Sequence, residues 1–173
     1  MVFITHDLDE AVTVGDRIAI MRDGEIIQMG TPEEIILNPV DDFVTEFTED
    51  VSKERVLNVS AVSVDPDLIW THSQDLTKLK DDLNTAGAQH VAFVNESGNS
   101  LGVLMRNDIE QIASSEELDH MLRESSPAIL NSSNVRPAIL KLANSETPVP
   151  VVDSQKKLLG VITQSSILKS LAE

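Results

Sequence analysis

Apolar and polar positions in the first 50 residues predict alternating strands and helices. Val2-Phe3-Ile4 has the pattern of a short buried strand, and the acidic turn after it favours the start of a helix. Two apolar runs, 17–21 and 25–29, predict strands. Asp23-Gly24 between them is a strong signal for a tight hairpin.

Two helices are expected after this hairpin. Thr31 and Pro32 suit the N-cap and the first position of a helix that ends near Leu37. A further helix is expected over 41–47. The acidic, polar stretch that follows predicts a linker, which we place at 51–55.

The rest of the chain contains an internal repeat. An offset of 58 residues superposes 91–109 on 149–167 without a gap, and most paired positions are apolar in both copies. The identical pairs are Val91/Val149, Val94/Val152, Leu101/Leu159, Gly102/Gly160, Val103/Val161 and Ile109/Ile167. Such self-similarity predicts two copies of one structural unit.

Each repeat predicts a helix, a strand, a turn, a second strand and a closing helix. In the first repeat they are expected at 74–86, 91–94, 95–100, 101–105 and 107–113, and in the second at 135–143, 149–152, 153–157, 158–163 and 165–171. A further helix over 115–123 lies between the repeats. Pro150 removes one ladder donor, so its strand is expected at a sheet edge or beside a bulge.

Composition and charge narrow the function classes. The chain has 29 acidic and 13 basic residues, a net charge of −16, so nucleic acid and anionic membrane surfaces should be repelled. Residues 1–55 carry −10 and residues 56–173 carry −6, which favours a boundary near 50–56. Cysteine is absent, which excludes disulfides and thiolate metal sites. The four histidines have no ligand-like spacing, so no metal site is predicted.

Targeting and membrane signals are also missing. No apolar run approaches the ~20 residues that a bilayer span needs. The first residues have neither the basic nor the apolar region of a signal peptide, and we expect the chain to start inside a domain. Ile18, Ile20, Ile26 and Ile27 would then form an exposed apolar patch unless they pack on another surface, and we expect oligomerisation through this segment.

The repeat resembles a tandem pair of CBS (cystathionine-β-synthase-type) domains. Val149-Pro150-Val151-Val152-Asp153 and Leu159-Gly160-Val161-Ile162-Thr163 are similar to the two recurrent segments of that family. The resemblance covers about residues 56–172. It implies an α+β (α/β) fold with two β-α-β-β-α units.

The first 50 residues resemble the end of an ABC nucleotide-binding domain. Phe3-Ile4-Thr5-His6-Asp7-Leu8-Asp9-Glu10-Ala11 is similar to the switch-histidine segment of that family, and 16–32 is similar to its downstream hairpin. An ABC tail followed by two CBS units is similar to the ATPase subunits of quaternary-amine importers, the glycine betaine/proline osmoprotectant class. The expected domains are an ABC fragment at 1–50, a linker at 51–55, a first CBS domain at 56–114, and a connecting helix with a second CBS domain at 115–173.

The ABC resemblance implies a catalytic role for His6, the switch histidine, in a full-length parent that uses ATP and Mg²⁺. The chain itself lacks the rest of that machinery. None of its seven glycines is followed by Lys, so there is no phosphate-cradling loop, and the signature and Walker B motifs are also absent. We therefore expect this chain to be no enzyme, to hydrolyse no ATP and to require no cofactor.

The CBS resemblance implies a ligand cleft for an adenosine nucleotide or a cyclic dinucleotide. Nucleotide-binding CBS domains resemble G-x-x-[TS]-x-x-D, and each repeat retains one of the two polar groups. Asp108 has Met105 in place of the hydroxyl, while Thr163 has Ser166 in place of the acid. Pro150 and Val152 complete the candidate set. The alternative is that Asp108 and Thr163 only cap the helices that follow them.

The combined resemblance implies a regulatory tail that gates or dimerises an importer ATPase in response to ionic strength or a nucleotide. The implied partners are a second copy through the CBS pair, a membrane permease subunit and a substrate-binding protein, without nucleic acid. The implied location is the cytoplasmic face of the inner or plasma membrane. Two alternatives remain: a stand-alone adenosine-nucleotide sensor and a purely structural dimerisation module.

Overall fold

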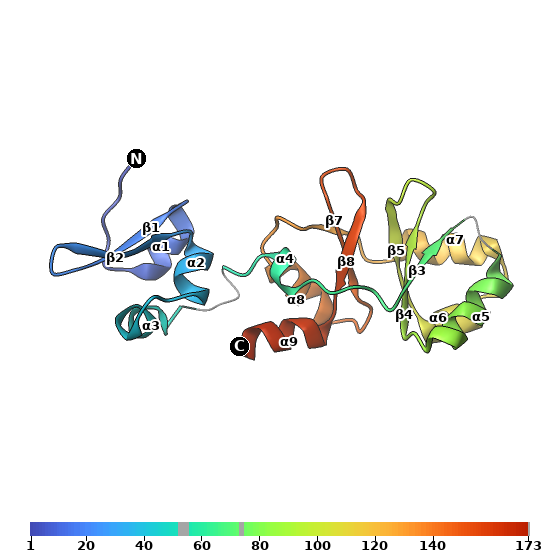
Figure 1. Cartoon of the computed structure of the whole chain (residues 1–173). Helices are drawn as coiled ribbons and strands as arrows, with labels where there is room; N and C mark the ends of the chain where they lie inside the picture. Colours follow the sequence, from blue (N-terminus) through green and yellow to red (C-terminus); the bar gives the residue numbers. More distant parts are fainter. Residues whose placement is uncertain (52–55, 73–74, 173) are drawn as a thin grey trace. The chain divides into compact units, whose positions relative to one another are not determined.

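The computed structural model describes residues 1–51, 56–72 and 75–172, which divide between two compact units, Met1–Leu57 and Asn58–Glu173 (Figure 1). The predicted linker at 51–55 lies outside the described residues except for Val51. No described helix has the length and apolar character needed to cross a bilayer.

The first unit is an antiparallel hairpin with three short helices. Its elements are α1 (Leu8–Val14), β1 (Ile18–Arg22), β2 (Glu25–Gly30), α2 (Pro32–Leu37) and α3 (Asp42–Thr48). Asp23 and Gly24 both have positive φ, which the tight turn between β1 and β2 requires. A capping box between Thr31 and Glu34 starts α2, as the sequence predicts.

The first unit has a core of its own. Ile18 and Ile20 of β1 are buried and pack with Ile35 and Val44 of the two following helices. The expected exposed patch is therefore wrong for these two isoleucines, because α2 and α3 cover them. Ile26 remains exposed.

The predicted strand at Val2-Phe3-Ile4 does not form. These residues have no regular structure and their side chains are exposed. A strand needs a neighbour for its backbone N–H and C=O groups, and none of the described residues pairs with this segment.

The second unit contains the two predicted β-α-β-β-α repeats. The first consists of β3 (Leu68–Thr71), α5 (Leu76–Ala86), β4 (His90–Val94), β5 (Ser100–Met105) and α6 (Arg106–Gln111). The second consists of β6 (Ile129–Leu130), α8 (Arg136–Leu142), β7 (Val149–Val152), β8 (Leu158–Ile162) and α9 (Gln164–Ala172). Each sheet has the same topology: its opening strand is parallel to the second, which forms an antiparallel hairpin with the third.

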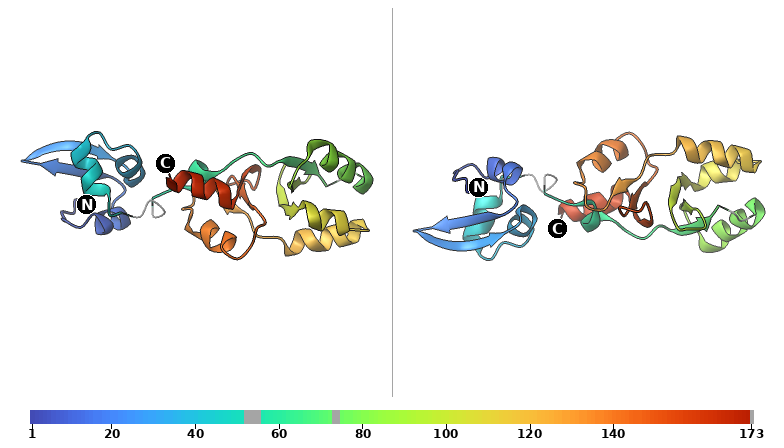
Figure 2. Two further views of the ribbon diagram at one scale, coloured as in Figure 1. Left: turned by 90° about the horizontal axis from the view of Figure 1, so that it is seen from below. Right: turned by 90° about the horizontal axis from the view of Figure 1, so that it is seen from above.

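The two sheets face each other, and the helices lie on their outer sides (Figures 1 and 2). Ala92 and Val103 of the first sheet pack against Val161 of the second. The larger core of the first repeat lies on the other face of its sheet, around Phe93 and Leu79, both fully buried. Each repeat thus buries apolar surface against the other, which explains why the unit is a pair.

The leading helix of each repeat packs on the other repeat. Helix α4 (Val59–Val62) precedes the first repeat but contacts α9 of the second, and Val64 forms a β-bridge with Val161. Helix α7 (Ser115–Glu124) precedes the second repeat but adds Leu118 and Leu122 to the core of the first. The repeats therefore exchange their leading segments.

Two equivalent glycines make this exchange possible. A Cβ on Gly102 would collide with Ser125, and a Cβ on Gly160 would lie 2.6 Å from the Ser63 hydroxyl and 2.8 Å from the Val64 carbonyl oxygen. These glycines are one of the identical pairs of the sequence repeat. Both positions are glycine because the exchanged segment approaches the backbone too closely for a side chain.

Pro150 lies in the middle strand of its sheet, so the predicted edge position is wrong for β7. The predicted bulge is present, between Val151 and Val152. The edge strand β6 pairs only with Val151 and Val152, so it does not reach the residue that lacks an N–H donor.

Candidate functional site

The candidate cleft residues of the first repeat lie where β5 ends and α6 begins. Met105 is the N-cap residue of α6 and provides no side-chain hydrogen bond there. Asp108 is in the first helical turn, is half-buried and has no hydrogen-bond or ion-pair partner among the described residues. Its carboxylate is available for a ligand, but the hydroxyl that should accompany it is missing.

The corresponding hydroxyls of the second repeat are used by the protein. The Thr163 hydroxyl accepts from the Ser166 N–H at 3.0 Å, and the Ser166 hydroxyl accepts from the Thr163 N–H at 3.1 Å. The Ser166 hydroxyl also donates to the Thr163 carbonyl oxygen at 3.0 Å. This reciprocal pattern caps α9, so the alternative that Thr163 is a helix cap fits the geometry.

Pro150 and Val152 are both buried in β7. The six candidate residues are thus divided between the repeats, with Met105 and Asp108 in the first and the other four in the second. Among the described residues, no hydrogen bond joins the two groups.

A buried histidine lies beside this end of the first sheet. His90 pairs with Met105 across β4 and β5. The Asp67 backbone N–H donates to Nε2 of His90 at 3.3 Å, and Nδ1 of His90 lies 3.1 Å from the Asp67 carboxylate, which also accepts from the Gln89 N–H at 2.8 Å. These contacts indicate the neutral tautomer with its proton on Nδ1. Burial lowers the pKa of His90, and the Asp67 carboxylate opposes that shift.

These contacts fit an adenosine ligand only in part. Asp108 could accept from a ribose hydroxyl, but Asp67 is already engaged with His90 and Gln89, and Thr163 and Ser166 satisfy each other. ATP with Mg²⁺ does not fit this chain, because no residues of a phosphate-binding loop are present in its sequence.

His6 is exposed and immediately precedes Asp7, the N-cap residue of the first helix of the first unit. Asp7 is the N-cap of α1 and accepts from the Glu10 N–H at 3.1 Å. The Thr5 hydroxyl donates to the Glu10 carboxylate at 2.8 Å. These contacts fix the turn around His6, while the imidazole itself has no partner among the described residues.

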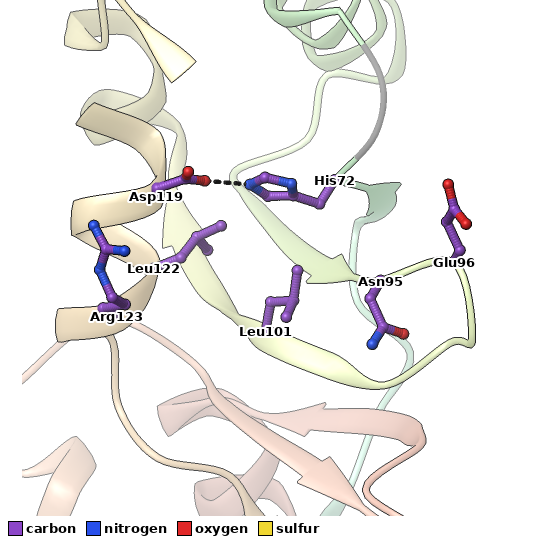
Figure 3. A pocket seen from close by; sticks show the side chains of 7 residues that line it. All are labelled: His72, Asn95, Glu96, Leu101, Asp119, Leu122 and Arg123. Atoms are coloured by element: carbon purple, nitrogen blue, oxygen red, sulfur yellow. Dashed lines mark hydrogen bonds and ion pairs between the residues drawn. The ribbon is translucent and has the colours of Figure 1, made fainter. Parts of the chain in front are cut away.

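The sequence analysis missed a pocket at the opposite end of the first sheet. The pocket has a volume of about 490 Å³ and is lined by His72, Asn95, Glu96, Leu101, Asp119, Leu122 and Arg123 (Figure 3). Nε2 of His72 lies 2.5 Å from the Asp119 carboxylate and so connects the end of β3 to α7. The signal that could have indicated the pocket is the pair of polar residues Asp119 and Arg123 on the helix predicted at 115–123. The sequence does not reveal what this helix packs against.

The family comparison supports the class that the fold indicates. A model of the CBS domain matches residues 127–173, the second repeat. OpuCA from Staphylococcus aureus superposes on 66% of this chain and 96% of its own, with a TM-score of 0.53 and 22% identity. A CBS domain pair/ACT domain protein from Thermotoga maritima covers 67% of this chain and 97% of its own, with a TM-score of 0.55 and 14% identity. The second unit has the fold of a CBS domain pair.

Similarity to curated relatives includes the first unit as well. The glycine betaine transport ATP-binding protein OpuAA of Bacillus subtilis is 30% identical over 176 residues, which cover 99% of this chain and 41% of the relative. ProV of Escherichia coli, a glycine betaine/proline betaine transport ATP-binding protein, is 31% identical over 180 residues, with 99% and 44% covered. The chain spans less than half the length of these relatives. The resemblance to ATP-binding proteins of glycine betaine transport is confirmed.

Proposed function

We propose that this chain is the regulatory tail of the ATP-binding subunit of an ABC importer for osmoprotectants of the glycine betaine/L-proline type. The observation that carries this proposal is the extent of the similarity. It runs over 99% of the chain and so includes both the CBS pair and the first unit. A stand-alone nucleotide sensor would not need a first unit similar to such subunits.

In the full-length parent, His6 would act as the switch histidine of a site that binds ATP and Mg²⁺. The parent would bind a membrane permease subunit at the cytoplasmic face and receive substrate from a binding protein. The chain alone would hydrolyse no ATP, because it has no phosphate-binding loop.

The exchanged leading segment offers a route from the CBS pair to the ATPase. The first residues of the second unit are held by the second repeat: the Val59 N–H donates to Ser133 at 2.8 Å, and Val64 exchanges two backbone hydrogen bonds with Val161 at 2.8 and 2.9 Å. A shift between the repeats would therefore move the segment that follows the first unit. The same shift, imposed in a homodimer, would alter the spacing of two ATPase domains.

Ionic strength is a physically reasonable trigger for this movement. The net charge of −16 on 173 residues produces repulsion between copies, which salt weakens as the Debye length shortens to ~8–10 Å. Higher salt would then favour closer association of two acidic chains.

One experiment on the chain and one on the parent test this proposal. Small-angle scattering and light scattering of the chain from 50 to 500 mM KCl should show a salt-dependent dimer, whereas a salt-independent dimer would favour the purely structural module. ATP hydrolysis by the assembled importer should depend on salt, and removal of residues 58–173 should abolish that dependence without abolishing hydrolysis. Unchanged salt dependence after the removal would contradict the proposal.

Calorimetry with adenosine nucleotides and cyclic dinucleotides at the same salt concentrations distinguishes the nucleotide-sensing alternative.

A further inference from the structure

The pocket at the Val94 end of the first sheet is distinct from the predicted nucleotide cleft. In the register of β4 and β5, His90 pairs with Met105 at one end, and Val94 pairs with Ser100 at the other. Asp108 follows the first end, whereas Glu96 and Leu101 line the pocket at the second. A ligand in this pocket would therefore leave the Asp108 end free.

Two exposed side chains of opposite charge line the pocket and have no partner among the residues that the structure describes. Arg123 extends from α7, and Glu96 lies in the turn after β4. Neither side chain forms an ion pair or a hydrogen bond with any described residue. Figure 3 shows them on opposite sides of the pocket, with Leu101 and Leu122 between them.

The remaining polar side chains of the pocket each have at least one partner in the protein. His72 and Asp119 pair with each other at 2.5 Å. The Asn95 side-chain oxygen accepts from the Ser97 N–H at 3.0 Å and from the Asn99 N–H at 2.9 Å. The pocket thus offers a free cation, a free anion and an apolar floor.

This charge pattern is not a general product of the fold, because the second repeat lacks it. Strand register, the sequence offset and the equivalent contacts of Ser125 and Ser63 with the two glycines define the matching positions. The counterparts of His72, Glu96, Leu101, Leu122 and Arg123 are Asn131, Ser154, Leu159, Ser60 and Ala61. The apolar Leu101 is retained as Leu159, but both unpaired charges have neutral counterparts.

We propose that this pocket binds a small dipolar molecule with a carboxylate at one end and a cationic nitrogen at the other. Arg123 would bind the carboxylate through its planar guanidinium, Glu96 would bind the cation, and the two leucines would contact the carbon chain between them. A volume of about 490 Å³ is within the usual range for small-molecule sites. A ligand with one charge would leave either Arg123 or Glu96 without a partner.

The ligand would also contact both the exchanged helix α7 and the repeat on which this helix packs. Arg123 and Leu122 belong to α7, the leading helix of the second repeat, whereas Glu96 and Leu101 belong to the first repeat. Binding would hold α7 on the first sheet and so strengthen the exchange.

Matched probes test the ligand class. We would titrate the full chain by calorimetry with 4-aminobutyrate and 6-aminohexanoate, whose two lengths allow for different spacings of the charges. The comparison compounds are butyrate and butylamine, and hexanoate and hexylamine. At least one dipolar probe should bind saturably and roughly tenfold more tightly than both of its singly charged analogues. Absence of saturable binding by both dipolar probes, or equal affinity of the analogues, would overturn the proposal.

Variants and spectra test the location. Arg123→Gln and Glu96→Gln should each weaken binding roughly tenfold, whereas the matched changes Arg136→Gln and Glu146→Gln, at exposed positions in the second repeat, should leave it unchanged. Backbone ¹⁵N–¹H shifts should change around Leu101 and Arg123 and not around Asp108. Equal losses in the control variants, or shifts confined to the Asp108 end, would place the site elsewhere and reject the proposal. Melting temperatures of all four variants show whether each remains folded.

Discussion

Lys156 occupies in the second repeat the position that Gly98 occupies in the first, and both have a left-handed backbone, with φ of 66° and 80°. The surrounding turns are equivalent as well. The Asp153 carboxylate accepts from the N–H groups of Gln155 and Lys157, as the Asn95 oxygen does from Ser97 and Asn99. The two turns also bond to each other, since the Ser100 N–H donates to Lys156 and the Leu158 N–H donates to Gly98.

Replacement of Lys156 by glycine should therefore stabilise the protein. A left-handed backbone costs a side-chain-bearing residue roughly 1–2 kcal/mol, and the extra freedom of glycine in the unfolded chain offsets part of the gain. We expect the free energy of unfolding to rise by about 0.5–1 kcal/mol in urea titrations. Lys157→Gly removes the same charge at the next position and should destabilise. A loss of stability in Lys156→Gly would contradict the strain argument.

Replacement of Gly160 by alanine should destabilise the CBS pair. The added Cβ would lie 2.8 Å from the Val64 backbone oxygen, which can move only if the exchanged segment moves. Overpacking of this kind costs roughly 1–3 kcal/mol. Thermal and urea unfolding measure the loss.

Gly87→Ala is the control for this change, because no atom lies within 4 Å of an added Cβ there. Its cost should come from its positive φ alone. If Gly160→Ala has no effect on stability, the close contact with the leading segment is not present in solution.

His90 should make stability fall as pH drops below about 6.5. Burial lowers the pKa of His90 in the folded protein. As pH falls, the unfolded chain therefore binds a proton near pH 6.5, whereas the folded chain binds it only at lower pH. The contribution of His90 is therefore complete above pH 6.5 and is lost as pH falls. The slope for one proton is at most about 1.4 kcal/mol per pH unit.

Urea unfolding of wild type and His90→Gln at pH values above and below about 6.5 checks the prediction, and the variant should have a flatter profile. His120→Gln is the control, since His120 and its neighbour Glu124 are both largely exposed. Identical profiles for wild type and His90→Gln would exclude His90 as the source.

Removal of the Thr163 hydroxyl tests whether this group is a cap or a ligand contact. Thr163→Ala should cost about 1 kcal/mol of stability, because the first turn of α9 loses its side-chain acceptor. Any affinity for adenosine nucleotides should remain unchanged in calorimetry. A tenfold loss of nucleotide affinity without loss of stability would instead assign Thr163 to a ligand site.

Much of the fold could be predicted from local patterns. The hairpin at Asp23-Gly24 and the helix start at Thr31 depend on a few neighbouring residues, and both form as expected. The repeat predicted two equal units because identical residues recur at one offset. The prediction of a strand at residues 2–4 was wrong because a strand depends on a distant partner.

Long-range features could not be predicted in this way. The opening strands β3 and β6 have four and two residues, too few for a periodic pattern. The exchange of leading helices depends on contacts such as that of Gly102 with Ser125, and spacing along the chain does not encode them. The pocket was missed for the same reason, since His72 and Asp119 meet across 47 residues. At the candidate cleft, the sequence located Asp108 and Thr163 at helix starts but could not show that the Thr163 hydroxyl already has partners.

The exchange of leading helices also determines how the chain can be divided. Leu118 and Leu122 complete the hydrophobic core of a repeat that ends before them, while the segment around Val64 completes the sheet of a repeat that begins far beyond it. This is the arrangement of an arm-swapped dimer whose two copies have been fused into one polypeptide. A chain cleaved between Ala113 and Ser114 should therefore stay associated as two interlocked fragments. The two halves, made separately, should form the folded pair when they are mixed and should not fold alone.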